Sequence, residues 1–197
     1  FMIQTCHEYG IECYAWINPY RYHTSKNGTH GGGALDYEVT HPEWLMSGTT
    51  SNTVLNPAKK EVLQRILDVT REIVTNYDVD GVVFDDYFYP SNYPLPEGET
   101  RDGVTANERR DHVNDLIKGV YKTIKKADSS VEFGISPMGI WKNNTSDAEG
   151  SATKGTEGYY SVFGDAKTWV EKEWVDYIVP QIYWERGNAS ADYETLV

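Results

Sequence analysis

The chain has 197 residues, of which 30 are acidic and 18 basic, giving a formal net charge of −12. This acidic balance argues against a nucleic-acid partner or an anionic membrane surface, because both are held by clustered lysine and arginine. Hydrophobic residues make up 39% of the sequence, and no apolar run reaches the ~18 residues that a membrane-spanning helix needs. The length suits one domain with a sizeable core, so residues 1–197 are predicted to form a single domain.

Four short apolar runs, rich in β-branched and aromatic residues, are predicted to be strands. They are mainly apolar rather than alternating, which is typical of strands covered on both faces. A helix is expected at residues 2–9, and the helix at residues 57–77 is expected to have Asn56 as its N-cap and Pro57 at its first position. In chain order, the predicted strands are 11–17 (IECYAWI), 80–86 (DGVVFDD), 131–137 (VEFGISP) and 177–184 (YIVPQIYW). The other predicted helices are 107–127, 165–174 and 191–197.

The alternation of strands and helices predicts an α/β fold with a parallel sheet. The loops after the strands are long, at residues 18–56, 87–106 and 138–164, whereas the loops before the strands are short. Functional loops of α/β folds follow the carboxyl ends of the strands. A (β/α)₈ TIM-type barrel needs eight βα units, so four strands favour about half of such a barrel over a complete small α/β domain.

The strongest candidates for chemistry are Asp85 and Asp86, which directly follow the apolar residues 82–84. Neighbours on a regular strand point to opposite faces, so the two side chains are not expected to face one another while the strand stays regular. Burying a carboxylate is costly unless it is paired or hydrogen-bonded. The pair therefore either caps the next turn or supplies a nucleophile or a general acid/base.

Polar and aromatic side chains also follow the other predicted strands. Such groups, gathered with carboxylates at one end of a barrel, suit a cleft that binds glycans. Asn18 and Gln181 are expected to hydrogen-bond sugar hydroxyls, and Arg21 is expected to orient a carboxylate. The aromatic residues expected to position sugar rings are Tyr20, Tyr87, Trp141, Tyr183 and Trp184.

Glycoside hydrolysis normally requires two carboxyl groups, ~5–5.5 Å apart for retention and ~6.5–9.5 Å apart for inversion of configuration. The pair predicted within this chain is Asp85 or Asp86 with Glu185. Glu185 lies between Trp184 and Arg186, so the alternative interpretation is that it is a solvated loop residue. The second carboxylate could equally come from strands outside this chain.

Five ordered motifs resemble the glycosyl hydrolase-like 10 family, whose members are bacterial (β/α)₈-barrel proteins of the cell envelope. The motifs are AWINPYR (15–21), LNPAKKEV (55–62), YDVDGVVFDDYFYP (77–90), GISPMGIW (134–141) and YIVPQIYWE (177–185). The resemblance covers nearly the whole chain and implies that its strands are the third to sixth of the barrel. It implies hydrolysis of a polysaccharide, with peptidoglycan glycan strands as the substrate class, in the cell envelope or outside the cell. The site residues it implies are Asn18, Tyr20, Arg21, Asp85, Asp86, Tyr87, Gln181, Tyr183 and Glu185.

Two other functions compete with a glycoside hydrolase. A metal-dependent polysaccharide deacetylase also places two aspartates after an apolar strand, but the sequence has no histidines spaced i and i+4. No residue of the sequence excludes the second function, a non-catalytic carbohydrate-binding barrel. The sequence predicts no cofactor and no dedicated metal site, and leaves open a divalent cation on Asp85 and Asp86. The polar residues 143–158 are expected to form a mobile loop that serves as a lid.

Overall fold

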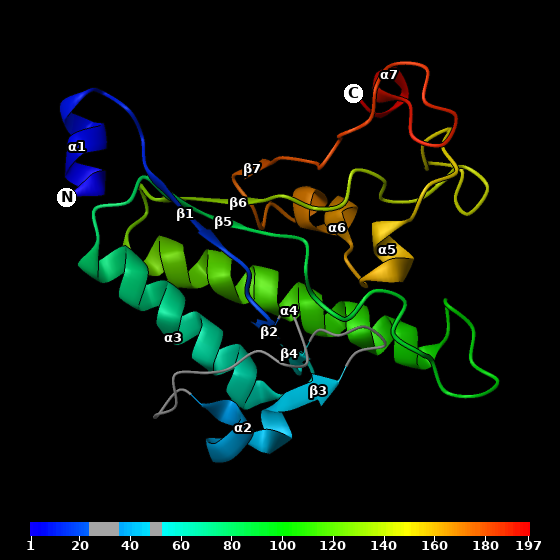
Figure 1. Cartoon of the computed structure of the whole chain (residues 1–197), viewed down its shortest axis with the longest axis horizontal. Coiled ribbons are helices and arrows are strands. Elements are labelled where there is room, and N and C mark those ends of the chain that lie inside the picture. The colour runs from blue at the N-terminus through cyan, green and yellow to red at the C-terminus, as the bar shows by residue number, and fades with distance from the viewer. Residues whose placement is uncertain (24–35, 48–52) are drawn as a thin grey trace.

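The computed structural model of the chain describes residues 1–23, 36–47 and 53–197. Its centre is a four-stranded parallel sheet in the order β1-β5-β6-β7, which is also their order along the chain (Figure 1). The strands are β1 (Tyr14–Ile17), β5 (Gly81–Phe84), β6 (Glu132–Ile135) and β7 (Tyr177–Ile178). The prediction of an α/β fold with a parallel sheet is confirmed, and each strand is shorter than its apolar run.

Two long helices, α3 (Lys60–Asn76) and α4 (Val104–Ala127), cover one face of this sheet (Figure 1). Apolar residues recur every three or four positions in both helices, so each helix presents an apolar stripe to the sheet. The shorter helices are α1 (Met2–Glu8), α2 (Tyr37–Thr40), α5 (Gly158–Ser161), α6 (Ala166–Glu171) and α7 (Tyr193–Leu196), with a 3-10 turn at Pro42–Trp44. Within the described ranges, every helix falls short of the length or the apolar character that spanning a bilayer requires.

The core between the sheet and the helices also fixes the loop that follows β5. Phe84 at the end of β5 and Phe133 of β6 are fully buried, and their rings meet edge to face with centroids 5.3 Å apart. Phe88, four residues further on, packs in the same manner on Trp169 of α6, with centroids 5.6 Å apart. The residues between Phe84 and Phe88 are therefore anchored at both ends by buried aromatic rings.

A small antiparallel sheet, in the order β2-β4-β3, lies in the region that is predicted to be one long loop. Its strands are β2 (Arg21–His23), β3 (Leu45–Ser47) and β4 (Thr53–Leu55). Each strand has three residues, which is too few for an alternating pattern to be recognised. The prediction of a loop over residues 18–56 is therefore wrong for these described segments.

The start of α3 also differs from the prediction. The helix begins at Lys60 with Lys59 at the N-cap position, rather than at Pro57. The side chain of Asn56 instead accepts a hydrogen bond from Ala58 N at 3.0 Å, which closes a turn before the helix. Asparagine stabilises such turns as well as helix N-caps, so the residue type alone does not distinguish the two.

Residues 143–158 are joined to one another by hydrogen bonds. The buried side chain of Asn143 donates to Gly155 O at 3.0 Å and accepts from Thr153 Oγ1 at 2.7 Å. Its backbone N donates to Glu157 Oε1 at 2.8 Å, and its backbone forms a β-bridge with Ser151. The segment predicted to be a mobile lid is thus internally bonded, which its polar composition does not reveal, and its role as a lid stays a prediction.

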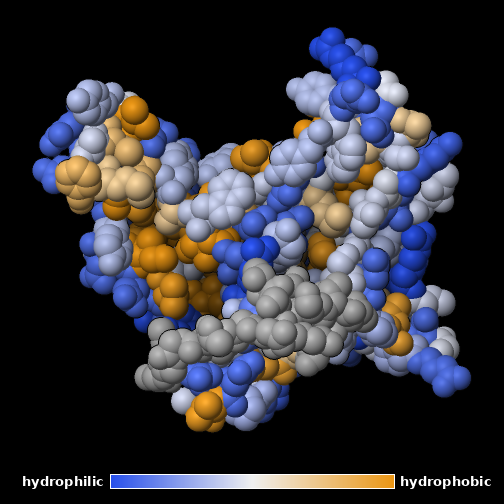
Figure 2. Space-filling model, viewed as in Figure 1, coloured by the Kyte–Doolittle hydropathy of each residue, from blue (hydrophilic) through white to orange (hydrophobic). Residues whose placement is uncertain are grey.

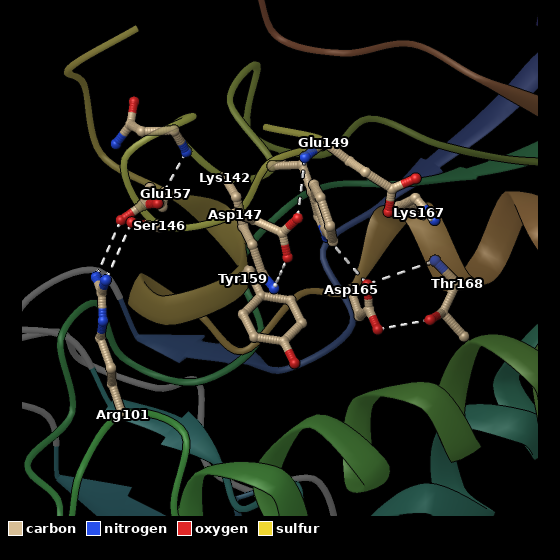
Figure 3. A network of polar contacts seen from close by, with 12 residues as sticks. Arg101, Lys142, Ser146, Asp147, Glu149, Glu157, Tyr159, Asp165, Lys167 and Thr168 are labelled. Carbon is tan, nitrogen blue, oxygen red and sulfur yellow. Dashed lines mark hydrogen bonds and ion pairs between the residues drawn. The ribbon is translucent and has the colours of Figure 1, made fainter. Parts of the chain in front are cut away.

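Asp165 caps α6 and connects it to the loop after β6. Its carboxylate accepts hydrogen bonds from Thr168 Oγ1 at 2.6 Å and Thr168 N at 3.4 Å (Figure 3) and from Trp141 Nε1 at 3.0 Å. We expect Asp165→Ala to lower the free energy of unfolding by about 1 kcal/mol, as is typical of a lost N-cap. Denaturant unfolding measures the change. Asp165→Asn is the control that keeps a capping oxygen, and an alanine variant as stable as this control would contradict the role of Asp165.

Candidate active site

The carboxyl ends of the parallel strands meet at one edge of the sheet. Ile17 of β1 is paired with Phe84 of β5, and Phe84 with Ile135 of β6. The alignment continues past the strands, since Asp85 N donates to Ile17 O at 3.0 Å and Ser136 N donates to Phe84 O at 2.8 Å. The residues that follow the strands therefore lie together, at the edge where the sequence predicts the site.

The carboxylate of Asp85 is held in one orientation by hydrogen bonds. Its Oδ1 accepts from Gln181 Nε2 at 3.0 Å and from the backbone N of Asp86 at 2.9 Å. The same Gln181 nitrogen donates to Ser136 O at 3.0 Å, which fixes the amide group between β6 and the segment after β7. The structure thus brings together two predicted site residues, Asp85 and Gln181, that lie 96 positions apart in the sequence.

Asp86 is partly buried, and one of its carboxyl oxygens is poorly solvated. This oxygen, Oδ1, is buried and has no hydrogen-bond partner among the described residues. Burial, which penalises the charged form, and then the neighbouring Asp85 raise the pKa of Asp86 to about 6. The two aspartates interact because β5 ends at Phe84, so the opposite orientation of strand neighbours no longer applies. Asp86 therefore keeps its proton to a higher pH than an ordinary aspartate, and a proton donor needs such a raised pKa.

Asp86 lies in the wall of two cavities. One, the Asp86 cavity, has a volume of about 240 Å³ and is lined by Asp86, Met138, Gly139, Thr156, Gln181, Tyr183 and Trp184. The other, of about 260 Å³, extends along the loop after β5 and includes Tyr87. Tyr183 is 79% exposed and Trp184 39% exposed, so these rings form an open rim of the Asp86 cavity. An acid, an amide and exposed aromatic rings are thereby gathered around one hollow, as the sequence predicts.

Asn18, Arg21 and Tyr87 form a neighbouring group at the same edge. The guanidinium carbon of Arg21 lies 4.1 Å from the centroid of the Tyr87 ring, which is a cation–π contact. Asn18 Oδ1 accepts a hydrogen bond from Arg21 N at 3.2 Å, and Asn18 Nδ2 is buried with no hydrogen-bond partner in the described ranges. Because Tyr87 shares a cavity with Asp86, this group adjoins the two aspartates.

Tyr20 does not reach either cavity. Its side chain is fully buried in the core, in the same cluster as Val54 and Leu55 of β4, and its backbone O accepts from Leu55 N at 2.7 Å. The prediction that Tyr20 positions a sugar ring is therefore wrong. The sequence shows an aromatic residue after a strand but not the direction of its ring, and the small sheet that gives the ring a buried place was not predicted.

Trp141 and Glu185 line neither cavity of Asp86. Trp141 lines a mainly apolar hollow of about 330 Å³ that shares Met138 and Gly139 with the Asp86 cavity, and its Nε1 donates to Asp165. Glu185 is exposed, lines neither cavity of Asp86 and has no side-chain partner in the described part of the chain. The structure does not bring either residue to the aspartates, so the catalytic role of Glu185 stays a prediction.

Three residues of the Asp86 cavity were not predicted to belong to the site, namely Met138, Gly139 and Thr156. Met138 lines both cavities of Asp86, and its position shortly after β6 was a signal that could have identified it. Thr156 belongs to the hydrogen-bonded residues 143–158, and no local pattern distinguishes it. Its place depends on the contacts of Asn143, which only the folded structure reveals.

Asp85 and Asp86 are the carboxylates at this edge that could contact a cation. Magnesium and calcium take about six to eight oxygen ligands, some of which are water. The described residues include no group of three or more histidine, cysteine, aspartate and glutamate side chains arranged to hold a metal ion. A cation at the two aspartates would therefore need most of its ligands from water or from a bound molecule.

Comparisons of the sequence with known proteins identify a family and similar glycosyl hydrolases. The sequence profile of Glycosyl hydrolase-like 10 matches residues 1–197. Glycosyl hydrolase DigH of Escherichia coli (strain K12) is 35% identical over 215 residues, covering 100% of this chain and 48% of that protein. Glycosyl hydrolase YngK of Bacillus subtilis (strain 168) is 36% identical over 213 residues, covering 100% of this chain and 40% of that protein. The chain thus spans less than half the length of either relative.

Similar solved structures include the galactosidase domain of alpha-galactosidase-sucrose kinase, AgaSK. The match covers 91% of this chain and 20% of that chain, with a TM-score of 0.49 and 14% sequence identity. A likeness this partial has no bearing on the chemistry of the site.

Proposed function

The chain belongs to the glycosyl hydrolase-like 10 family, and on that premise we propose that the protein hydrolyses glycosidic bonds of a polysaccharide with Asp86 as the proton donor. One observation carries the proposal: the carboxyl group of Asp86, with its pKa raised to about 6, lies in the wall of a cavity rimmed by Tyr183 and Trp184. Glycosidases use such a carboxylic acid to protonate the oxygen of the leaving sugar.

In the proposed reaction, Asp86 gives its proton to the glycosidic oxygen while the bond from that oxygen to the anomeric carbon breaks. Positive charge develops on the sugar ring that stays behind. The neighbouring carboxylate of Asp85, oriented by Gln181, favours the protonated form of the donor before the reaction. The exposed rings of Tyr183 and Trp184 are proposed to hold the sugar over the Asp86 cavity.

A second carboxyl group must act on the other side of the sugar, as a nucleophile or as a base for water. We propose Glu185 for this role because it directly follows Trp184, which lines the Asp86 cavity. Glu185 has no side-chain partner in the described ranges, so no such contact has to break before it turns toward a bound sugar.

We further propose that the parallel sheet contributes the third to sixth strands of a (β/α)₈ barrel. The sequential strand order and the position of the functional loops at the carboxyl ends of the strands support this proposal. The proposed substrate is the glycan strand of peptidoglycan, and the proposed location is the bacterial cell envelope or its exterior. The relatives from Escherichia coli and Bacillus subtilis support a bacterial setting.

Release of reducing ends from purified peptidoglycan glycan strands tests the proposal. We expect the intact wild-type protein to produce new reducing ends and Glu185→Gln to produce far fewer, while Glu72→Gln, an exposed change on α3, keeps the wild-type rate. If the wild type binds the strands but releases no reducing ends, the protein is a carbohydrate-binding member of its family and the catalytic roles fail. Release of acetate without reducing ends would instead identify a deacetylase.

A further inference from the structure

A larger hollow, of about 460 Å³, adjoins the Asp86 cavity. Its walls come from the loop after β5, from a residue shortly before α4 and from residues 155–163. Thr156 lines both this hollow and the Asp86 cavity, so the two spaces meet at one side chain. We name the hollow the Arg101 pocket. Its lining includes Tyr93, Arg101, Glu157, Tyr160 and Phe163. Figure 2 shows, in the view of Figure 1, a surface on which hydrophilic residues are widespread.

Two arginines of α4 hold the walls of the Arg101 pocket in place. Arg109 donates to the backbone O of Tyr93 at 2.9 Å and to that of Pro94 at 2.8 Å. Arg110, which is only 3% exposed, donates to the backbone O of Arg101 at 3.2 Å and to that of Tyr159 at 3.4 Å. Both sides of the pocket are therefore tied to the same helix, which makes the pocket a preformed feature.

These two arginines also leave positive charge beside the pocket. Among the described residues, Arg109 and Arg110 donate to carbonyl oxygens and, for Arg110, to the amide oxygen of Asn107 at 2.8 Å, and neither forms an ion pair with a carboxylate. A partly buried charge without a counter-charge attracts an anion into its surroundings. The positive charge beside the pocket therefore contrasts with the net charge of −12 of the whole chain.

Arg101 is fixed at the mouth of the pocket with donors to spare. Its guanidinium carbon lies 3.9 Å from the centroid of the Tyr160 ring, while Nη1 donates to Glu157 Oε2 at 3.2 Å and Nη2 to Ser146 Oγ at 3.0 Å (Figure 3). A guanidinium has five N–H donors, so these two bonds leave about three. The side chain is 51% exposed and can meet a ligand from solvent.

Glu157 forms an ion pair with Arg101, so the charges of these two side chains largely offset one another. Its Oε1 accepts from Asn143 N at 2.8 Å and its Oε2 from Arg101, so both oxygens already have donors within the protein. The side chain is 10% exposed, which places its charge inside the wall. The carboxylate of Asp102 also lies beside Tyr160, so the positive charge around the pocket comes from Arg109 and Arg110, and Arg101 contributes its unused N–H donors.

We propose that the Arg101 pocket is a second subsite of the glycan cleft, for a sugar unit that carries a carboxylate. Arg101 donates to the carboxylate, and the aromatic wall of Tyr93 and Phe163 faces the apolar side of the sugar ring. The glycan then runs from the Asp86 cavity across Thr156 into the pocket. The identity of the ligand as a glycan rests on the proposed function, whereas the preference for a carboxylate rests on the arginines.

Calorimetric binding of a matched pair of oligosaccharides to the intact protein tests the subsite. One member is a carboxylated tetrasaccharide from peptidoglycan glycan strands, and the other is the same compound with its carboxylates converted to amides. In the Asp86→Asn background, which avoids turnover, we expect the acid form to bind about tenfold more tightly, as charge-assisted hydrogen bonds allow. Arg101→Gln should remove that preference and leave the affinity for the amide form unchanged, whereas Lys172→Gln, an exposed change beyond α6, should keep it.

Tyr160→Leu is a second variant that tests the subsite, because it keeps the charge of Arg101 but removes the ring on which the guanidinium lies. We expect it to weaken the preference for the acid form, and it replaces Arg101→Gln if that variant does not fold. Equal affinity of the two oligosaccharides, or a preference that survives both changes, would overturn the subsite. Binding with the expected preference but no release of reducing ends would refute the hydrolase and leave the subsite standing.

Discussion

Asp86→Asn is expected to lower kcat/KM for glycan hydrolysis by about 10²–10⁴-fold, the usual effect of removing a general acid. Asparagine has nearly the same shape as aspartic acid but has no acidic proton to give to the leaving sugar. The loss should fall on kcat more than on substrate binding, because the proton moves only as the bond breaks. Initial rates of reducing-end release over a range of glycan concentrations measure both constants.

The matched control is Asp78→Asn, at the opposite end of the sheet. The carboxylate of Asp78 is 93% exposed and lies 3.4 Å from Nδ1 of His7 in α1, and the residue comes before β5 rather than after it. This variant makes the same substitution at a residue outside the site and should keep the wild-type kcat/KM. If Asp86→Asn were folded and hydrolysed the glycan within about threefold of the control, Asp86 would not be the proton donor.

The rate of hydrolysis is expected to fall above about pH 6, by about fiftyfold between pH 6 and pH 8, and to approach a tenfold loss per pH unit. The active form of Asp86 is the protonated one, and burial together with Asp85 raises its pKa to about 6, so the donor loses its proton as the pH rises through that value. The pH profile of kcat/KM measures this fall, called the alkaline limb, and reports the pKa of the group in the free enzyme.

Asp85→Asn tests whether the titration of Asp86 causes the fall in rate at high pH. Removing the negative neighbour of Asp86 should lower the pKa of the donor and move the alkaline limb to lower pH. Gln181 keeps an oxygen partner in this variant, since the asparagine amide oxygen can still accept its hydrogen bond. A limb that stays at the same pH in Asp85→Asn, or that persists in the residual activity of Asp86→Asn, would show that another group titrates.

The raised pKa of Asp86 also makes the stability of the fold depend on pH. A group with a higher pKa in the folded than in the unfolded state stabilises the fold below its unfolded pKa, and this contribution is lost as the pH rises through the folded value. For Asp86 that window runs from its ordinary value of 3.8 to about 6. The rate measurements above pH 6 therefore need a parallel check that the protein stays folded.

The parallel sheet was predictable because its strands are buried on both faces. Continuous apolar runs such as GVVF in Gly81–Phe84 are visible without any structure, and helix-forming patterns between them imply a parallel order. The same reasoning placed Asp85, Asp86 and Gln181 at one edge, because the ends of parallel strands meet there. The hydrogen bond between Gln181 and Asp85 confirms that these side chains are neighbours.

The features that escaped prediction depend on contacts between distant segments. The strands of the small sheet have three residues each, which carry no readable period. Tyr20 and Trp141 resemble the exposed aromatic residues of the rim in type and in position after a strand, and only packing determines that one is buried and the other bound to Asp165. Thr156 and Arg101 come together through segments that have no shared motif.

Carbon-13 NMR titration of the aspartate carboxyl groups measures most directly whether the pKa of Asp86 is raised to about 6. The Asp86→Asn spectrum assigns the signal, and Asp85→Asn shows how far the two carboxyl groups titrate together. The expected result is a carboxyl signal with an apparent pKa near 6 in the wild type, absent from Asp86→Asn and shifted to lower pH in Asp85→Asn. If Asp86 titrated at or below its ordinary value of 3.8, it would be ionised at neutral pH and could not be the proton donor.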